Sequence, residues 1–496
     1  MFSLDRNAPG TLTDQIEWGL RQLMASGQMP PASRLLSIRQ LAAHLAVSPN
    51  TVVMAYDRLV ALGLIESRGT AGYFVSEPRT APFPDAQALE AGEVQEGVWL
   101  AQQAYAQPPG LLLASSGALP PAWLEDAVPT AVLQRGVARS GAGLAARCPP
   151  QGLAPLREHI AMLLRAQGIA ADAGRVLTTY GGSHAIDLIG RTFLQPGDTV
   201  LVENPGYFLM FDGLRRLGVR MVPVPRTPEG LDLAALEAAC VAHRPRLLFM
   251  QTVLHNPTGW SSTAANLHRV LVLAKAHGLL IAEDDVQGHF FSGHAPRLAS
   301  LSGLDGVIYC SSFCKALSPA LRMGYLAAEP GLLKALLREK ICSVLTTAAL
   351  NEYVMLEVLA AGRWRKHLDR LQAKLRKARS QCARQLTEAG IVLDHPGEGG
   401  LFLWGTAPEG VDVDELVQDA FRNQILLVRG TTFSADQGFG RHLRFNVVFA
   451  QQPRLAQYLH TRFAALRQGQ GAMGRAQAAA WLPPQPVQSP QKKGPP

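Results

Sequence analysis

The sequence predicts a multidomain chain, with a small N-terminal α+β domain and a large α/β domain built on a parallel sheet. Three observations support this fold class. The chain has 496 residues, which is more than a single hydrophobic core normally serves. Residues 1–77 contain two closely spaced helical patterns followed by two short strand-like runs. From about 111 to 465, helical patterns alternate with short apolar runs, which is typical of a parallel sheet with buried strands.

The N-terminal domain is predicted from SIRQLAAHLAVSPNTVVMAYDRLVALG at 37–63. Ser37, followed three residues later by Gln40, is a capping-box pattern that starts one helix. After a tight turn, Ser48 and Pro49 suit the N-cap and the first position of a second helix. The apolar stripe of that helix comprises Val52, Tyr56, Leu59 and Val60. The pattern predicts a helix-turn-helix, and strand-like runs around 68–72 add a wing. From spacing alone, a helical hairpin packed on the larger domain fits as well.

The segments outside these two domains have the composition of linkers and tails. Residues 78–110 are rich in Ala, Gln, Pro and Glu and are interpreted as a linker with some helix. Residues 466–496 consist largely of Gln, Ala, Pro and Gly, which predicts a disordered tail. The sequence therefore predicts boundaries at 1–77, 78–110, 111–465 and 466–496.

Composition also argues against several classes of protein. The first ten residues, MFSLDRNAPG, contain an acid and a proline where an apolar run would be needed, so we expect no signal peptide. The apolar helical pattern at 342–361 is interrupted by Asn351, Glu352 and Glu357, which favours a buried helix over a membrane span. The six cysteines have no paired spacing, which favours a reducing cytoplasm and no metal site. The net charge of +8 hints at polyanions, but residues 1–80 hold 7 Arg against 6 acids, a balance of only +1.

Polar segments that follow predicted strands carry the chemistry of the large domain. They are TTYGGSHAIDLIG at 178–190, ENPGYF at 203–208, HNPTGW at 255–260 and AEDDVQGHF at 282–290. Glycines at a helix N-terminus let a phosphate group approach the backbone N–H groups closely. An acid at the carboxyl edge of a parallel sheet lies where such sheets bind their ligands. Lys315 then stands among small and apolar residues, either as an ordinary solvated lysine or as a nucleophile whose pKa burial lowers. Together these residues suit pyridoxal phosphate, which needs a lysine, a carboxylate, a phosphate cradle and an aromatic face.

The order and spacing of these segments resemble fold-type I aminotransferases over about 111–465. The resemblance implies that Lys315 forms the Schiff base with the cofactor, that Asp284 pairs with its pyridine nitrogen and that Arg444 binds a substrate carboxylate. The resemblance further implies that Tyr207 stacks on the ring and that Asn256 contacts the ring hydroxyl and the substrate. The residues that it places at the phosphate are Gly181, Gly182, Ser183, Ser312 and Arg322.

Two positions depart from the family pattern. Gln287 stands in place of the tyrosine near the phenolic oxygen, and Arg147 in place of a tyrosine that reaches the partner subunit's phosphate.

Residues 11–77 resemble the winged helix of GntR-type bacterial transcription factors, through Ala55-Tyr56 and the glycine-rich wing RGTAG. The residues that this resemblance places on DNA are Arg34, Arg39, Ser48, Asn50, Thr51 and Arg68. Here too the chain departs from the family. Leu36 stands in place of a common proline, and Pro49 in place of an arginine that often contacts DNA. Phosphate positioning by Arg39 and Arg68 is therefore a firmer expectation than base contacts around Pro49.

A winged helix linked to an aminotransferase-like domain resembles MocR-type regulators, a branch of the GntR family. The resemblance implies a cytoplasmic, pyridoxal-phosphate-dependent transcriptional regulator that binds a double-stranded DNA operator as a homodimer. An amine or amino acid is the implied effector, with at most weak or partial transaminase activity. Two alternatives stay open. One is a genuine aminotransferase with an accessory DNA-binding domain, and the other is a DNA-binding scaffold whose large domain no longer binds cofactor.

Overall fold

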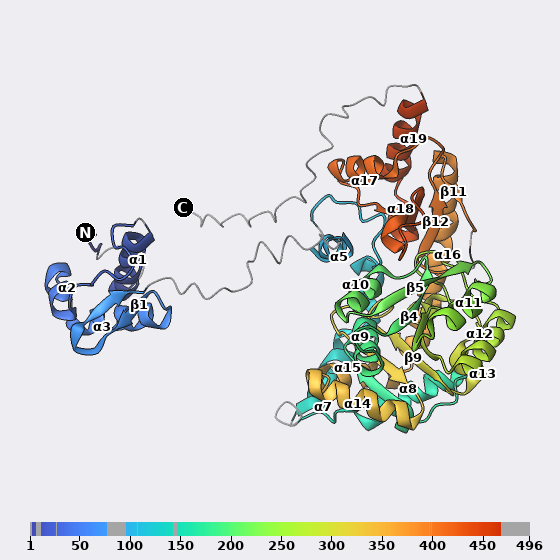
Figure 1. The fold of residues 1–496 in the computed structure, drawn as a ribbon, viewed down its shortest axis with the longest axis horizontal. Coiled ribbons are helices and arrows are strands. Elements are labelled where there is room, and N and C mark those ends of the chain that lie inside the picture. Colours follow the sequence, from blue (N-terminus) through green and yellow to red (C-terminus); the bar gives the residue numbers. More distant parts are fainter. Residues whose placement is uncertain are drawn as a thin grey trace. The chain divides into compact units, whose positions relative to one another are not determined.

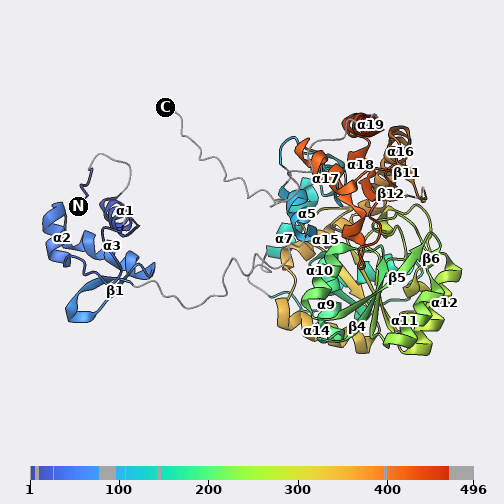
Figure 2. The same cartoon turned by 45° about the horizontal axis from the view of Figure 1, so that its top comes forward.

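The computed structural model describes residues 2–5, 11–25, 27–76, 96–106, 108–141, 147–395, 397 and 399–467. The chain divides into two compact units, Met1–Val94 and Gln95–Pro496, which are described separately. Figure 1 and Figure 2 show the elements of each unit. Most of the predicted linker, up to residue 95, lies outside the described residues, as does the predicted tail from 468 onward. The helical part expected in the linker is α5 (Glu96–Ala106).

The N-terminal unit is a winged helix-turn-helix. Its elements are α1 (Leu12–Ala25), α2 (Ile38–Leu45), α3 (Pro49–Ala61), β1 (Ile65–Ser67) and β2 (Tyr73–Val75). Ser37 caps α2 in a capping box with Gln40, and Ser48 caps α3, as the sequence predicts. The strands β1 and β2 pair antiparallel and form the wing.

The core of this unit confirms most of the predicted apolar stripe on α3. Val52, Tyr56 and Leu59 are fully buried, and the Tyr56 hydroxyl donates a hydrogen bond to the carbonyl of Leu36 at 2.7 Å. The prediction for Val60 is wrong, because its side chain is 38% exposed. Val60 lies about 80° around the helix from Val52, at the edge of the buried face.

The large unit contains an eight-stranded sheet in the order β3-β10-β9-β8-β7-β4-β5-β6. The strands are β3 (Val176–Thr179), β4 (Thr199–Asn204), β5 (Arg220–Thr227), β6 (Gly230–Leu231), β7 (Leu247–Met250), β8 (Leu280–Asp284), β9 (Val307–Ser312) and β10 (Gly324–Ala327). Six short apolar runs of the sequence form β3, β4, β5, β7, β8 and β9, namely VLTTY, DTVLVE, VRMVPVP, RLLFMQTVL, LLIAEDDV and GVIYCSS. Of these strands, β4, β5, β7, β8 and β9 are parallel to their neighbours in that group. The expectation of a purely parallel sheet is wrong, because β10 runs antiparallel to β3 and β9, and β6 antiparallel to β5. Residues 313–323, which connect β9 to β10, are too few for a crossover helix, so β10 returns beside β9.

Helices cover both faces of this sheet. Figure 1 and Figure 2 show α9 (Gly181–Phe193), α10 (Phe208–Arg216) and α14 (Pro330–Val344) on one side, with α11 (Leu233–His243) and α12 (Ala264–His277) on the other. Within β4, Val200 and Val202 pack in the cluster that includes α9 and α10, whereas Leu201 packs in the cluster that includes α11 and α12. Burial of both faces explains why the strands are continuous apolar runs in the sequence.

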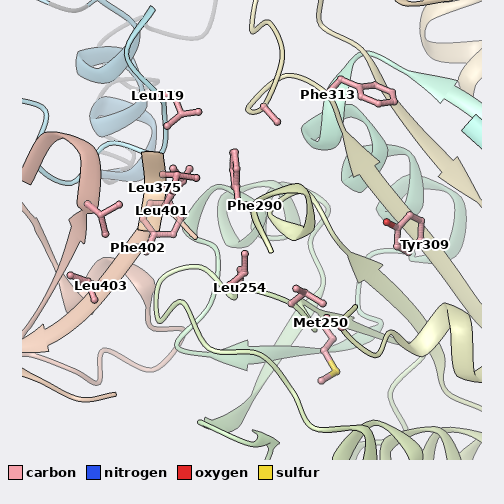
Figure 3. Packing of buried hydrophobic residues seen from close by; sticks show 14 of the residues in the cluster. Leu119, Met250, Leu254, Phe290, Tyr309, Phe313, Leu375, Leu401, Phe402 and Leu403 are labelled. Carbon is pink, nitrogen blue, oxygen red and sulfur yellow. The ribbon is translucent and has the colours of Figure 1, made fainter. Parts of the chain in front are cut away.

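A second, antiparallel sheet of four strands follows in the order β11-β12-β14-β13. Its strands are β11 (Val392–Leu393), β12 (Phe402–Thr406), β13 (Val428–Arg429) and β14 (His442–Asn446), and the nearby helices are α16 (Arg363–Ala389), α17 (Val413–Arg422), α18 (Val447–Ala450) and α19 (Pro453–Arg467). The largest hydrophobic cluster includes residues from both sheets. In Figure 3, Leu401, Phe402 and Leu403, at the start of β12, lie together, and Tyr309 and Phe313, from β9 and the segment after it, lie apart from them. The sequence did not predict this sheet.

Three further helices are α7 (Thr130–Ser140), α8 (Ala154–Ala166) and α15 (Ala349–Ala360). Helix α15 packs against α7 and α8, and α8 also packs against β3. The buried helix predicted at 342–361 is confirmed over Ala349–Ala360 as α15, but its start is wrong, since 342–344 belong to α14 and the chain breaks before Ala349. Leu345, in the break, has a φ of 60°, which no α-helix continues. No helix within the described ranges is long and apolar enough to cross a membrane.

Candidate cofactor and DNA-binding sites

The predicted cofactor residues gather at the carboxyl edge of the large sheet. Asp284 is the last residue of β8, Gly181 begins the helix that follows β3, and Lys315 lies in the connection from β9 to β10. Open α/β sheets bind ligands at this edge, because the loops after parallel strands meet there. The order of the strands thus brings together residues that are far apart in the sequence.

A candidate anion cradle forms at the N-terminus of α9. Gly181 has a φ of 78°, and a Cβ atom on it would lie 3.0 Å from Cys314 Sγ and 3.2 Å from Arg322 Nη2. A Cβ atom on Gly182 would lie 2.6 Å from Val286 Cγ2, so a larger residue has no room there. Arg322 donates to the carbonyl of Tyr180 at 3.2 Å, which holds its guanidinium beside the helix end. Free N–H groups, the helix dipole and an arginine together suit a phosphate.

Ser183 and Ser312 are the two serines predicted to bind at this cradle. The Ser312 hydroxyl is buried and accepts a hydrogen bond from the N–H of Cys314 at 3.1 Å. Ser183, in the first turn of α9, is exposed and interacts through its hydroxyl with Tyr207, the N-cap residue of α10. Burial raises the pKa of the Tyr207 phenol, so the ring is a neutral aromatic surface.

Asp284 is buried and held by two donors. Its Oδ1 accepts from the N–H of Val286 at 3.0 Å, and its Oδ2 accepts from Nε2 of Gln251 at 2.6 Å. Burial raises the pKa of Asp284, and these hydrogen bonds together with the positive charge of Lys315 oppose the rise. The pKa therefore stays above that of a free aspartate, and a cationic partner beside this carboxylate would favour its charged form.

Lys315 is half-buried, and burial lowers the pKa of its amine to about 8, against the opposing attraction of Asp284. The charge of Arg444 lowers it further. A Cβ atom on Gly117 would lie 3.9 Å from Nζ of Lys315 and 3.9 Å from Cζ of Phe402, so small and aromatic surfaces enclose the amine. A lysine with a lowered pKa is a better nucleophile near neutral pH than an ordinary solvated lysine.

Arg444 is a buried guanidinium on β14 with only neutral hydrogen-bond partners. Nη1 donates to Asn256 Oδ1 at 2.7 Å, and Nη2 donates to the carbonyl of Ser115. Its Cζ lies 4.5 Å from the ring centroids of both Phe402 and Phe433. No carboxylate in the described part of the chain forms an ion pair with Arg444, and its Nε has no partner there. Burial lowers the pKa of Arg444 to about 9, so a bound anion would relieve a real desolvation cost.

The structure does not connect Gln287 or Arg147 to these residues. Gln287 is 2% exposed, and within the described ranges neither its amide oxygen nor its amide nitrogen has a hydrogen-bond partner. Such an orphaned buried amide is costly unless a further group satisfies it. Arg147 is exposed just before α8.

Sequence reasoning missed several residues of the site. They are Ser115, Gly117, Gln251, Phe402 and Phe433. Only the glycine in SSGALPP, next to two serines and a Leu-Pro pair, offered a signal in the sequence. Gln251 and the two phenylalanines belong to strand ends or loops without a motif, and only the fold brings them to the lysine and the arginine.

These residues fit the predicted cofactor. The glycine cradle excludes any Cβ atom, a buried carboxylate stands opposite a lysine of lowered pKa, and the orphaned Gln287 amide can satisfy a further polar group. The predicted site holds three cations, Lys315, Arg322 and Arg444, against the single carboxylate Asp284. That balance suits a ligand with several negative charges, such as a phosphate ester together with a carboxylic acid.

The N-terminal unit presents the predicted DNA-contacting residues on its surface. Arg34, Arg39, Ser48, Asn50 and Arg68 are exposed, and Thr51 is half-buried. Arg34 pairs with Phe74 through a β-bridge, and the Arg68 guanidinium lies 4.6 Å from the Phe74 ring, so both arginines flank one residue of the wing. Arg68 also forms an ion pair with Glu66 at 2.6 Å, which phosphate could replace. Ser48 caps α3 by accepting from the N–H of Thr51 at 3.1 Å, which directs the start of α3 outward.

Family comparisons match both units. The aminotransferase class I and II family matches residues 111–456, and the gntR family of bacterial regulatory proteins matches residues 12–75. The first match covers both sheets of the large unit and includes Lys315 and Arg444. The second covers the winged helix.

Relatives of both kinds are known. The HTH-type transcriptional regulator YdcR of Escherichia coli, itself uncharacterized, is 30% identical over 88% of this chain and 94% of its own length. The HTH-type transcriptional regulator TauR of Rhodobacter capsulatus is 28% identical over 87% of this chain and 91% of its own. The crystal structure of alpha-aminoadipate aminotransferase from Thermus thermophilus, complexed with N-(5'-phosphopyridoxyl)-L-leucine, superimposes with a TM-score of 0.67 and 28% identity. That match covers 75% of this chain and 97% of that one. The chain therefore belongs to the aminotransferase class I and II family and, with its gntR-family domain, has the architecture of a MocR-type regulator with pyridoxal 5'-phosphate as its cofactor.

Proposed function

We propose that this protein is a pyridoxal-phosphate-dependent transcriptional regulator that senses an amine or amino acid through a Schiff base at Lys315. The single observation that carries the proposal is that two basic side chains lie over the same aromatic ring. Nζ of Lys315, whose pKa is lowered to about 8, lies 5.9 Å from the ring centroid of Phe402, and Cζ of the buried Arg444 lies 4.5 Å from it. The same chain carries a gntR-family DNA-binding domain.

Each predicted residue has a proposed task at the cofactor. Lys315 would bind the aldehyde carbon, and Asp284 would pair with the pyridine nitrogen so that the ring could withdraw electrons. Tyr207 would pack on the ring, Asn256 and Gln287 would lie near the phenolic oxygen, and the phosphate would be held by Gly181, Gly182, Ser183, Ser312 and Arg322. Gln287 would supply an amide donor, and its unpaired amide group supports this assignment. Arg444 binds the carboxylate of the effector.

A short structural path leads from Arg444 to the helix that begins the large unit. The Phe208 and Phe433 rings lie 5.4 Å apart, and both lie within 6 Å of the Arg444 guanidinium. Leu100 of α5 is buried in the same hydrophobic cluster as these two rings. In both views α5 lies beside α10 (Figures 1 and 2), and a Cβ atom on Gly97 would lie 2.6 Å from Phe208 Cδ2. Helix α5 is the first described element that follows the DNA-binding domain in the sequence. We propose that effector binding shifts this packing and thereby changes operator affinity, by no more than the effector's differential affinity for the two states.

Replacing Leu100 by alanine is expected to uncouple the two units. The cavity would loosen α5 from the rings next to Arg444, whereas Lys315 and Arg444 keep their own contacts. In a gel-shift titration, operator affinity of Leu100→Ala should no longer change when the effector is added, while the effector still shifts the visible absorbance. The matched control is Leu267→Ala in α12, also a buried leucine, which should keep the response. A normal response in Leu100→Ala would contradict the proposed path.

The exposed arginines of the winged helix are expected to bind phosphates of the operator. Replacing Arg39 and Arg68 together by alanine should weaken operator binding about 10-fold or more and reduce the salt dependence of log K by about 0.9 per lost contact. The measurement is a gel shift with the upstream region of the protein's own gene at several salt concentrations. The control is Arg21→Ala, an exposed arginine on α1, which should bind normally. Unchanged affinity in the double variant would rule out this docking face.

The proposed assembly is a homodimer in the bacterial cytoplasm, associated with the nucleoid when bound to a double-stranded operator. Exposed apolar side chains on α7 and at the end of α14, including Leu133, Val137 and Leu345, support a surface for a second copy. Exposure of Arg147 agrees with a role on the partner subunit's phosphate. Two winged helices per dimer would then read two half-sites.

A genuine aminotransferase is the second candidate, because 75% of the chain is also similar to an aminotransferase. One experiment distinguishes the candidates. Purified protein with cofactor is mixed with a panel of amino-acid donors and keto-acid acceptors, and operator affinity is measured with and without each donor. Sustained keto-acid production with no effect on DNA binding supports the enzyme. A donor that changes operator affinity with a single half-reaction or none supports the regulator. DNA binding without any visible absorbance band indicates a scaffold that has lost the cofactor.

A further inference from the structure

Gln251 lies immediately after β7, and its side chain connects the two ends of the candidate cofactor site. It is 8% exposed. Its Nε2 donates to Asp284 Oδ2 at 2.6 Å, and its Oε1 accepts from the N–H of Asn256 at 2.9 Å. Asn256 in turn accepts at 2.7 Å from Arg444 through Oδ1. A continuous chain of hydrogen bonds thus runs from the guanidinium through Asn256 and Gln251 to the carboxylate at the end of β8.

The orientation of the Gln251 amide is determined by its two neighbours. Asp284 offers only acceptors when it is ionised, and the backbone N–H of Asn256 is only a donor. An amide with its nitrogen toward Asp284 and its oxygen toward Asn256 satisfies both, whereas the flipped amide satisfies neither. The backbone N–H of Gln251 also donates to Glu203 Oε2 at 2.7 Å, which fixes the main chain. The Gln251 amide therefore has a single orientation that satisfies both of its neighbours.

We propose that Gln251 is a positioning residue that keeps Asp284 ionised and aimed at the cofactor's pyridine nitrogen, and holds Asn256 in line with Arg444. The inference rests on the proposed role of Asp284. A hydrogen bond donated to a buried carboxylate stabilises its charged form, which burial alone would disfavour. Glu203, which is 3% exposed, binds Arg226 and the backbone N–H of Gln251, and among the described residues it makes no hydrogen bond to Asp284.

The substitution Gln251→Glu tests the proposal because it preserves the shape of the side chain and replaces the amide nitrogen, a donor, by a carboxylate oxygen, an acceptor. The introduced carboxyl group can still accept from Asn256, but above its pKa it faces Asp284 with a negative charge instead of a donor. Affinity for pyridoxal phosphate, measured by absorbance titration, should fall about 10- to 100-fold at pH 8. It should recover as the pH is lowered through the pKa of the introduced carboxyl group, because its protonated form donates again. Wild-type protein should show no such recovery.

Gln251→Leu removes both hydrogen bonds and should lose a similar affinity with no recovery at low pH. If Gln251 only stabilises the fold, both variants lower the melting temperature while affinity and its pH profile stay as in wild type, and the inference is wrong. Asp284→Asn separates this outcome from a failure of the proposed function. If Asp284→Asn binds the cofactor as tightly as wild type, the proposed role of Asp284 itself is wrong. If Asp284→Asn weakens binding and Gln251→Glu does not, only the inference about Gln251 is wrong.

Discussion

Replacing Lys315 by alanine is expected to abolish the visible absorbance band of the protein saturated with pyridoxal phosphate. The amine at 315 is the only proposed covalent link between chain and cofactor, so its removal leaves the aldehyde free in solution or held only by the phosphate cradle. Borohydride treatment followed by mass spectrometry should attach the cofactor to wild-type protein at Lys315 and attach none to the variant. Lys334→Ala, which removes an exposed lysine on α14, is the control and should keep the band.

The pH dependence of this band gives a second and independent measurement. An ordinary lysine has a pKa of 10.5, and burial lowers that of Lys315 to about 8. The deprotonated amine is the nucleophile, so about one-tenth of the protein is reactive at pH 7, compared with well under one-thousandth for a solvated lysine. The rate of band formation should therefore rise with pH and level off above about 8. A rate that keeps rising to pH 10 would mean that the amine is not in the enclosed surroundings described above.

The sequence was informative where one segment carries its own signal. Apolar runs predicted six strands of the large sheet because strands buried on both faces leave no polar alternation. Ser37 with Gln40 and Ser48 with Pro49 predicted two helix starts, since capping is a contact between near neighbours. The positions of Lys315 and Asp284 at strand ends followed from the same strand assignments and from the family resemblance.

What the sequence could not predict depends on contacts between distant segments. Gln251 and Asp284 are 33 residues apart and meet because β7 and β8 are neighbours in the sheet. Asn256 and Arg444 are 188 residues apart and meet because the second sheet packs beside the first. The antiparallel direction of β10 and the antiparallel sheet around β12 likewise follow from chain connections, and hydrophobic periodicity says nothing about strand order. Val60 was wrongly predicted to be buried for a related reason. A stripe of apolar residues predicts which face of a helix is buried, but not how far around the helix the burial extends.

Replacing Arg444 by leucine is expected to remove recognition of the effector's carboxylate while leaving the cofactor band in place. A buried guanidinium that makes two parallel hydrogen bonds to a carboxylate contributes about 3 kcal/mol or more, so affinity for an amino acid should fall at least about 100-fold. Arg444→Lys keeps the charge but not the planar fork, and should lose an intermediate amount.

A pair of ligands separates this effect from general damage to the site. An amino acid and the corresponding amine without the carboxylate are titrated against wild type and Arg444→Leu, with the shift of the visible band as the readout. If Arg444 reads the carboxylate, wild type prefers the amino acid and the variant binds both ligands equally, with the amine unaffected by the substitution. Equal losses for both ligands would show instead that Arg444 serves mainly to hold Asn256 and Ser115, the two groups to which it donates. The balance of hydrogen bonds favours the first outcome, since Nε remains unpaired in the described part of the chain and the guanidinium has no anion beside it there.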